Sequence, residues 1–131
     1  MEITDINIVL LSCLVFLTNA GVAFYKEQYT YALLFVASFI YHSHNTVYTN
    51  AFDKFMIVLV ISYGAYLLYT KGTPENQLQQ LGVVTLFIAV LFLFFYGYCT
   101  DNYCFHPEHG NHYHGLLHFL SSMGHHWIIF L

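Results

Sequence analysis

The sequence predicts an all-α protein, a polytopic transmembrane bundle of about five helices. Of its 131 residues, 58% are hydrophobic and only 8% are charged, and the mean hydropathy is +0.58. A soluble domain carries about 25% charged residues. The apolar runs are continuous, whereas a membrane barrel would alternate apolar and polar residues. A membrane-spanning helix needs about 20 apolar residues, so the chain holds about five of them with short connections.

The composition also excludes several functional classes. Three lysines, no arginine and seven acidic residues cannot cover a water-soluble surface, and they form no basic patch for a nucleic acid. The aromatic content of 20% is far too high for a disordered chain. We therefore expect a multi-pass integral membrane protein with no nucleic-acid partner, although the sequence does not indicate which membrane holds it.

We expect the whole chain, residues 1–131, to form one transmembrane domain. The predicted spans cover residues 6–24, 29–48, 54–69, 81–98 and 112–131. The N-terminus lacks the basic segment of a cleaved signal peptide, so the first span is expected to be retained. Lysine-rich loops stay in the cytoplasm. Because Lys26 and Lys71 lie on the face opposite the N-terminus, and only Lys54 lies on the same face, the N-terminus is predicted outside and the C-terminus inside.

Polar and ionisable residues within the predicted spans are the functional candidates, because such groups are expensive in a bilayer. His114 and His118 are four residues apart, so they project from one helix face about 6 Å apart along the axis. Ser38 and His42 have the same spacing on the second span. Asp53 opens the third span. The second span ends, and the third and fifth begin, at the same membrane face, so we expect all five residues to lie close together.

Three imidazoles and a water form an open tetrahedral zinc site, the kind found in catalytic centres. We predict that His42, His114 and His118 bind zinc, that Asp53 acts as general base and then acid, and that Ser38 orients the water or stabilises the oxyanion. Each residue also has a purely structural interpretation. A single interfacial histidine snorkels, the histidine pair adjoins a histidine-rich loop, an isolated Asp at this position caps a helix, and Ser38 is a small packing residue.

These motifs resemble the signature of the CREST superfamily of membrane hydrolases. Ser-x-x-x-His appears as SFIYH from Ser38 to His42, the aspartate as FDKFM around Asp53, and His-x-x-x-His as HGLLH from His114 to His118. The superfamily includes alkaline ceramidases, adiponectin and progestin receptors, GPI-remodelling lipases, myomaker-like proteins and the SID family. The sequence around these motifs is most similar to the SID and GPI-remodelling branches. The resemblance covers about half of the chain.

The resemblance implies a zinc ion held by the three histidines, with Ser38 and Asp53 beside the water that the metal activates. It also implies hydrolysis of an amide or ester bond of a lipid, as in ceramidases and phospholipases. The family core has seven spans, whereas we count five. Seven and five are both odd, so the last span still enters the membrane from the same face as in the family. The loss of two helices removes part of the wall around a lipid chain.

Three functions therefore compete: a zinc-dependent lipid hydrolase, which we favour, a non-catalytic receptor, lipid-binding or fusion protein with a structural zinc, and a metal or solute transporter. The expected partner is a membrane lipid. A homo-oligomer is expected through four small residues that we take as exposed, namely Gly21, Ala23, Gly64 and Ala65. Cys99 and Cys104 are either a disulfide or two free thiols, and Cys13 is a packing residue. His125 is expected to line the cavity without binding the same ion.

Overall fold

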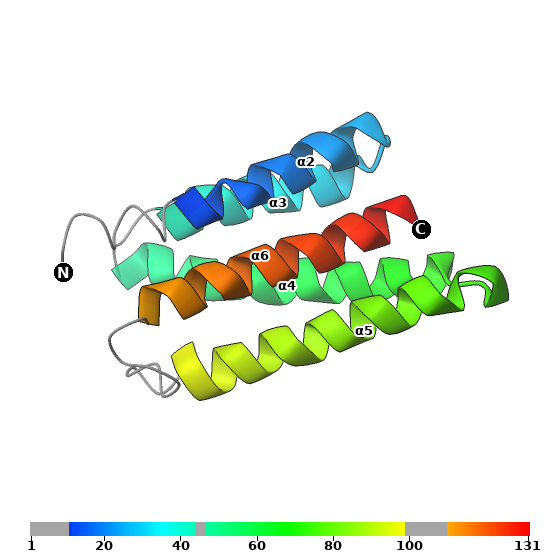
Figure 1. Ribbon diagram of the computed structural model, residues 1–131. Coiled ribbons are helices and arrows are strands. Elements are labelled where there is room, and N and C mark those ends of the chain that lie inside the picture. The colour runs from blue at the N-terminus through cyan, green and yellow to red at the C-terminus, as the bar shows by residue number, and fades with distance from the viewer. Residues whose placement is uncertain (1–10, 44–46, 99–109) are drawn as a thin grey trace.

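The computed structural model describes residues 11–43, 47–98 and 110–131, and these residues are helical apart from short turns, with no strand among them. Five helices run alternately in opposite directions (Figure 1): α2 (Val15–Tyr25), α3 (Tyr29–Ser43), α4 (Val47–Lys71), α5 (Gln77–Phe92) and α6 (Gly110–Phe130). A 3-10 turn, η1 (Pro74–Asn76), precedes α5, and a π-helical segment, η2 (Leu93–Tyr98), extends it. The predicted all-α class is confirmed.

Helix α6 joins the two halves of the bundle. It packs against α2, α4 and α5, while α2 packs on α3 and α3 on α4. In Figure 1, α6 lies between the α2–α3 pair and α5. The core is formed largely by residues of α2, α3 and α6, including the fully buried Tyr31 and Phe35. The position of α6 therefore determines which side chains face one another inside the protein.

The C-terminal end of α6 is held by one side chain at the end of α4 and one just before α3. The Lys71 Nζ donates hydrogen bonds to the carbonyl oxygens of Ile128 and Ile129, at 2.7 and 2.9 Å. The Gln28 Nε2 also donates to the Ile129 carbonyl, at 3.0 Å. The last carbonyls of a helix have no partner within the helix, and a cation there also interacts favourably with the helix dipole. These contacts fix the end of α6 against α3 and α4.

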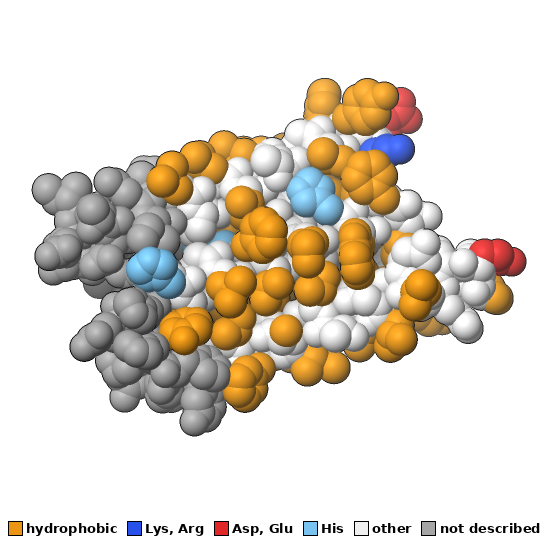
Figure 2. Space-filling model, viewed as in Figure 1, with side chains coloured by type: hydrophobic (Ala, Val, Ile, Leu, Met, Phe, Trp, Pro, Cys, Tyr) orange, Lys and Arg blue, Asp and Glu red, His pale blue; other side chains and the backbone are white. Residues whose placement is uncertain are grey.

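Much of the described surface is apolar. Large hydrophobic side chains are exposed on every long helix; examples are Leu33 (70% exposed), Ile88 (60%) and Phe119 (55%). In Figure 2, such side chains spread across the middle of the visible face, and the coloured acidic and basic groups lie at one end. Two helices, Ala51–Lys71 and Pro74–Phe95, are long and apolar enough to cross a membrane, with mean hydropathies of 1.6 and 2.3.

The helix ends differ from the predicted ranges. Helix α4 begins at Val47 rather than near residue 54, so Val47 and Tyr48, which we assigned to the second helix, belong to α4. Helix α5 begins at Gln77, four residues before the predicted start. The reason is that hydropathy marks the apolar stretch, whereas the backbone remains helical through flanking polar residues. Residues 6–10 of the first predicted span lie outside the described residues.

The expectation of an exposed row of small residues is wrong at two of its four positions. Ala23 is 0% exposed and belongs to the core. Gly64 is buried and approaches the side chains of His125 and Tyr31. Gly21 and Ala65 are exposed, as expected. Helices that are apolar on all sides do not indicate which side is buried, and this is why the sequence misplaced Ala23 and Gly64.

The close approach at Gly64 gives a first prediction. A Cβ at this position would lie 3.1 Å from the His125 Cε1 and 3.2 Å from the Tyr31 hydroxyl oxygen. Both neighbours are buried, so they have little room to move. In Gly64→Ala we expect this crowding to outweigh the helix-propensity gain of about 1 kcal/mol, giving a net loss of about 1 kcal/mol in the free energy of unfolding.

The matched control is Gly21→Ala, where a Cβ would meet no atom within 4 Å. This variant should be as stable as the wild type or more stable. Thermal unfolding of the two variants in the same detergent would measure the difference. A Gly64→Ala protein that gained as much stability as Gly21→Ala would contradict the described packing.

Candidate functional site

A cavity of about 340 Å³ lies inside the bundle, between side chains of α2, α3, α4, α6 and the α5–η2 helix. Its wall includes four of the five residues that the sequence singled out: Ser38, Asp53, His114 and His118. They come from three helices, and the rest of the wall is mostly aliphatic or aromatic. The fold therefore brings a small set of polar groups together within an apolar surface. This is the usual composition of a small-molecule binding site.

Asp53 lies within α4 rather than at its start, because the helix begins six residues earlier, at Val47. The alternative interpretation of Asp53 as an N-cap is therefore wrong. Its side chain is buried, at 6% exposure, and lines the cavity. Ser38, which is also buried, reaches the same cavity from α3. A hydroxyl and a carboxylate thus line the same cavity.

The two histidines of the His-x-x-x-His motif lie on the same side of α6, as their spacing requires. Their ring centroids are 4.5 Å apart, with the ring planes at 65°. His118 is buried at 3% exposure, and His114, one turn closer to the helix start, is half-buried. Both line the cavity. Two imidazoles this close can contribute nitrogen ligands to one metal ion.

The His118 ring is oriented by a contact that sequence reasoning missed. Its Nδ1 lies 2.7 Å from the Ser12 Oγ and 3.9 Å from the Cys13 Sγ, both in the helical turn that precedes α2. The Phe16 ring packs edge-on against it, with centroids 5.3 Å apart. Metal-binding histidines usually have their second ring nitrogen hydrogen-bonded in this way, which fixes the tautomer and the ring orientation. The contact engages Nδ1 and orients the ring.

The third predicted metal ligand, His42, belongs to α3 by its backbone, four residues after Ser38. Its side chain lies outside the described part of the structure. So do Cys99, Cys104, His106 and His109, which belong to the segment before α6. Among the side chains that are described, no three His, Cys, Asp or Glu residues form a metal-binding group. The zinc ion and the role of His42 stay predictions.

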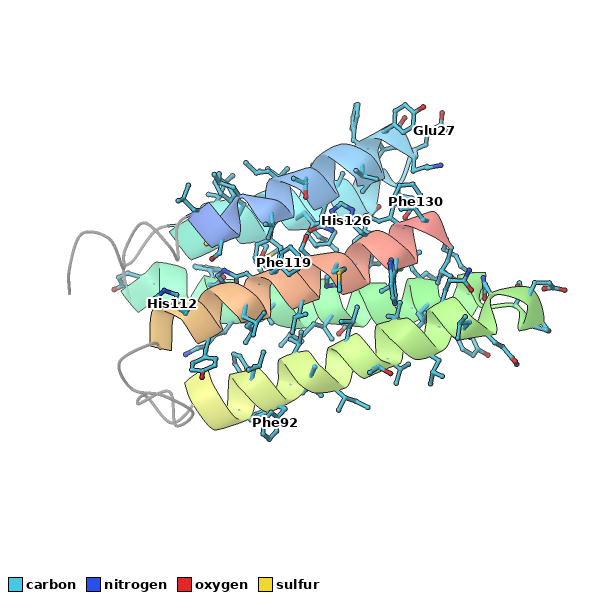
Figure 3. The ribbon with its side chains drawn as sticks, viewed as in Figure 1. Glu27, Phe92, His112, Phe119, His126 and Phe130 are labelled. Atoms are coloured by element: carbon cyan, nitrogen blue, oxygen red, sulfur yellow. The ribbon has the colours of Figure 1, made fainter. Side chains whose placement is uncertain are left out.

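Further along α6, two more buried polar groups have partners on other helices. The Asn19 Nδ2 donates to the Ser122 carbonyl at 3.0 Å, and the Ser122 hydroxyl donates to the Asn19 Oδ1 at 2.6 Å. The Tyr31 hydroxyl is hydrogen-bonded to the His125 Nδ1. Near the surface, the Thr18 hydroxyl lies 3.0 Å from the His126 Nε2. Figure 3 places His126 close to α2 and His112 at the opposite end of α6.

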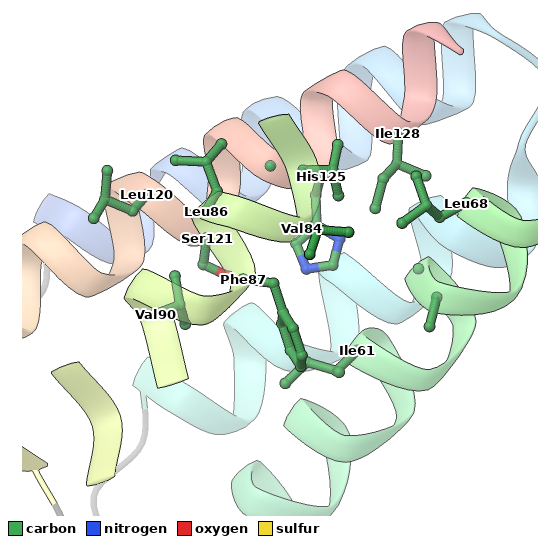
Figure 4. Close-up of a pocket in the computed structure, with 14 residues that line it drawn as sticks. Ile61, Leu68, Val84, Leu86, Phe87, Val90, Leu120, Ser121, His125 and Ile128 are labelled. Carbon is green, nitrogen blue, oxygen red and sulfur yellow. The ribbon is translucent and has the colours of Figure 1, made fainter. Parts of the chain in front are cut away.

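A second, smaller cavity of about 110 Å³ lies between α4, α5 and α6 (Figure 4). It adjoins the first, because four residues line both: Ile61, Val90, Ser121 and His125. The expectation that His125 lines the cavity is therefore confirmed. Together the two cavities extend from the polar residues near the start of α6 toward Ile128, close to its end.

Comparisons with protein-family models, with curated proteins and with solved structures found no match. The resemblance to the CREST superfamily remains a prediction based on the motifs themselves.

Proposed function

We propose that this protein is a zinc-dependent integral-membrane hydrolase that cleaves an amide or ester bond of a lipid. One observation carries the proposal. Ser38, Asp53, His114 and His118 line a single cavity inside a bundle whose surface is largely apolar. These residues supply the groups that hydrolysis needs, and they come from separate helices, so sequence proximity alone does not explain their convergence.

The surface of the bundle supports a location in the membrane. Exposed aliphatic and aromatic side chains cover the long helices. The two connections at the end of the bundle where α2 ends and α5 begins carry four charged residues: Lys26, Glu27, Lys71 and Glu75. In the proposed topology all five helices span the bilayer. The connections that carry Lys26 and Lys71 are placed inside, because lysine-rich loops stay in the cytoplasm. With five spans, the C-terminus is then inside and the N-terminus outside.

The donor set fits a zinc ion. The hydrogen bond between Ser12 and the His118 Nδ1 orients the imidazole, and the His114 ring lies beside it. We propose that each of the two histidines gives the metal one nitrogen. His42 is proposed as the third ligand, one turn after Ser38 on α3. Zinc held by these residues would supply a hydroxide nucleophile at neutral pH and polarise the scissile carbonyl.

The remaining residues of the cavity have distinct roles in this proposal. The Asp53 carboxylate accepts the proton of the attacking water and returns it to the leaving amine or alcohol. The Ser38 hydroxyl donates a hydrogen bond to the carbonyl oxygen as negative charge develops there. The low polarity of the surrounding wall strengthens both interactions, because few waters compete with them. The same wall provides space for a hydrocarbon chain.

A transporter of metal ions is the second candidate, favoured by one observation. Buried polar side chains continue along α6 from His118 through Ser122 to His125. In the described structure, however, Ser122 and His125 are hydrogen-bonded to Asn19 and Tyr31, so they join helices rather than line an open path. Zinc uptake into proteoliposomes would favour transport. One bound zinc per chain with no hydrolysis of lipids would favour a non-catalytic receptor, lipid-binding or fusion protein.

The metal proposal predicts that zinc affinity depends on Ser12. Removing the hydrogen-bond partner of a metal-binding histidine typically lowers affinity 10- to 100-fold, so Ser12→Ala should lower zinc affinity by about that factor. His118→Ala should lose most of the zinc. Competition with a chelator, followed by elemental analysis of the purified protein, would measure both effects.

The matched control is Thr18→Val. It also removes a hydroxyl of α2 that contacts an imidazole of α6, but Thr18 and His126 are outside the cavity. Its zinc affinity should equal that of the wild type. Full zinc retention in His118→Ala would rule out the assignment of this ligand.

The mechanism predicts that Asp53→Asn retains zinc but loses turnover. The amide keeps the size of the side chain but cannot accept the proton, and general acid–base groups contribute about 10²- to 10⁴-fold. Hydrolysis of a panel of ceramides and phospholipids should therefore fall by about that factor at equal zinc content. Glu75→Gln, which removes a carboxylate at the other end of the bundle, should have wild-type turnover.

Loss of zinc from Asp53→Asn would mean that Asp53 is a ligand or supports one. If the wild-type protein hydrolysed no member of the panel, the non-catalytic alternative would replace the proposal.

A further inference from the structure

His125 is a polar group in an otherwise apolar part of the interior. It is 8% exposed and lines both cavities. Its ring packs against Tyr31 and Phe35, with centroids 5.5 and 5.1 Å apart, and Gly64 leaves room for it on α4. Figure 4 shows the ring among aliphatic side chains of α4, α5 and α6. The imidazole is thus held in place by contacts from three helices.

The hydrogen bond to Tyr31 determines which ring atom remains available. It occupies the His125 Nδ1, so Nε2 is the nitrogen that can bind a ligand in the cavity. Among the described residues that line the smaller cavity, Ser121 and His125 alone have hydrogen-bonding side chains. They are four residues apart and therefore lie on the same side of α6. A ligand oxygen at this point can therefore form a hydrogen bond with the imidazole.

The shape and chemistry of the adjoining cavities limit the class of ligand. Apart from the polar residues at one end and the pair Ser121 and His125, the wall is apolar and suits a hydrocarbon chain. His125 lies seven residues after His118 on α6, which corresponds to about 10 Å along the helix axis. A chain that began at the hydrolytic site would therefore pass His125 at an inner carbon and not at its end.

We propose that the two adjoining cavities bind a single acyl chain with a hydroxyl or keto oxygen part-way along its length, and that the His125 Nε2 forms a hydrogen bond with this oxygen. His125 is then a specificity-determining residue, and Ser121 is a second polar contact for the same oxygen. The direction of the acyl chain, with its carbonyl end near His118, rests on the proposed hydrolytic function. The binding preference does not, because it requires neither zinc nor turnover.

The test uses the full chain in nanodiscs of dioleoylphosphatidylcholine. Stearate and a set of hydroxystearates, with the hydroxyl at different positions along the chain, compete with a fluorescent fatty acid, and partition into empty nanodiscs is subtracted. A single hydrogen bond contributes about 1 kcal/mol, so one positional isomer should bind about fivefold more tightly than stearate. Isomers with the hydroxyl elsewhere should bind no better than stearate.

Variants then assign the preference to His125. His125→Phe should still bind stearate but lose the preference for the favoured isomer. Ser122→Ala is the matched control, because it removes a buried hydroxyl of α6 that pairs with Asn19 and does not line either cavity. It should keep the preference even if it is less stable. Removing zinc with a chelator should also leave the preference unchanged, and this separates the inference from the proposed hydrolysis.

Two results would overturn the inference. The first is a wild-type protein that binds all the isomers and stearate equally, a result that needs no variant to fold. The second is an unchanged preference in His125→Phe, which would assign the discrimination to another part of the molecule. In either case His125 would serve only to join α6 to α3 through Tyr31.

Discussion

Buried imidazole, hydroxyl and amide groups in so apolar a protein must find hydrogen-bond partners, because each group left without one costs about 1–3 kcal/mol. Helix α6 carries such groups along its length, and three of them have partners on α3 or on the segment from Ser12 to Asn19. His118 contacts Ser12, Ser122 pairs with Asn19, and His125 pairs with Tyr31. These contacts fix the rotation of α6 about its own axis. Once that rotation is fixed, His114 and His118 face the cavity.

The same constraint links stability to the proposed chemistry. At the far end of α6, Lys71 and Gln28 bind the last carbonyls and limit sliding of the helix. Apolar packing alone does not select one orientation of α6, because the neighbouring helices are apolar on every side. The polar pairs along the helix select it. Two of the proposed zinc ligands, His114 and His118, therefore lie on the same helix as the groups that hold the bundle together. We expect substitutions on the inner side of α6 to affect folding and function together, and this is why the experiments above rely on paired control variants.

Some of the site was predictable from local sequence. The spacing of His114 and His118 implies a shared helix face whatever the tertiary structure. The order of the apolar segments, which alternate in direction, implies that Ser38, Asp53 and the histidine pair meet at one end of the bundle. Both arguments require only helix geometry and connectivity, and the structure brings these four residues to one cavity.

Other features depend on contacts between helices, which the sequence does not encode locally. Ser12 and Asn19 are isolated polar residues in an apolar segment, and nothing in their spacing indicates that they pair with α6. Ala23 and Gly64 were misplaced for a related reason, because a helix that is apolar on all sides gives no signal for its buried face. The start of α4 was also missed, since polar residues before Asp53 continue the helix.

The account depends most on the proposed zinc ion at His42, His114 and His118. Zinc K-edge X-ray absorption of the protein purified in lipid would test this directly, because nitrogen and sulfur ligands lie at different distances. We predict one zinc per chain with only nitrogen and oxygen neighbours at about 2.0–2.1 Å. A sulfur neighbour at about 2.3 Å, which would indicate Cys13 beside His118, or a protein that retains no zinc, would contradict the account.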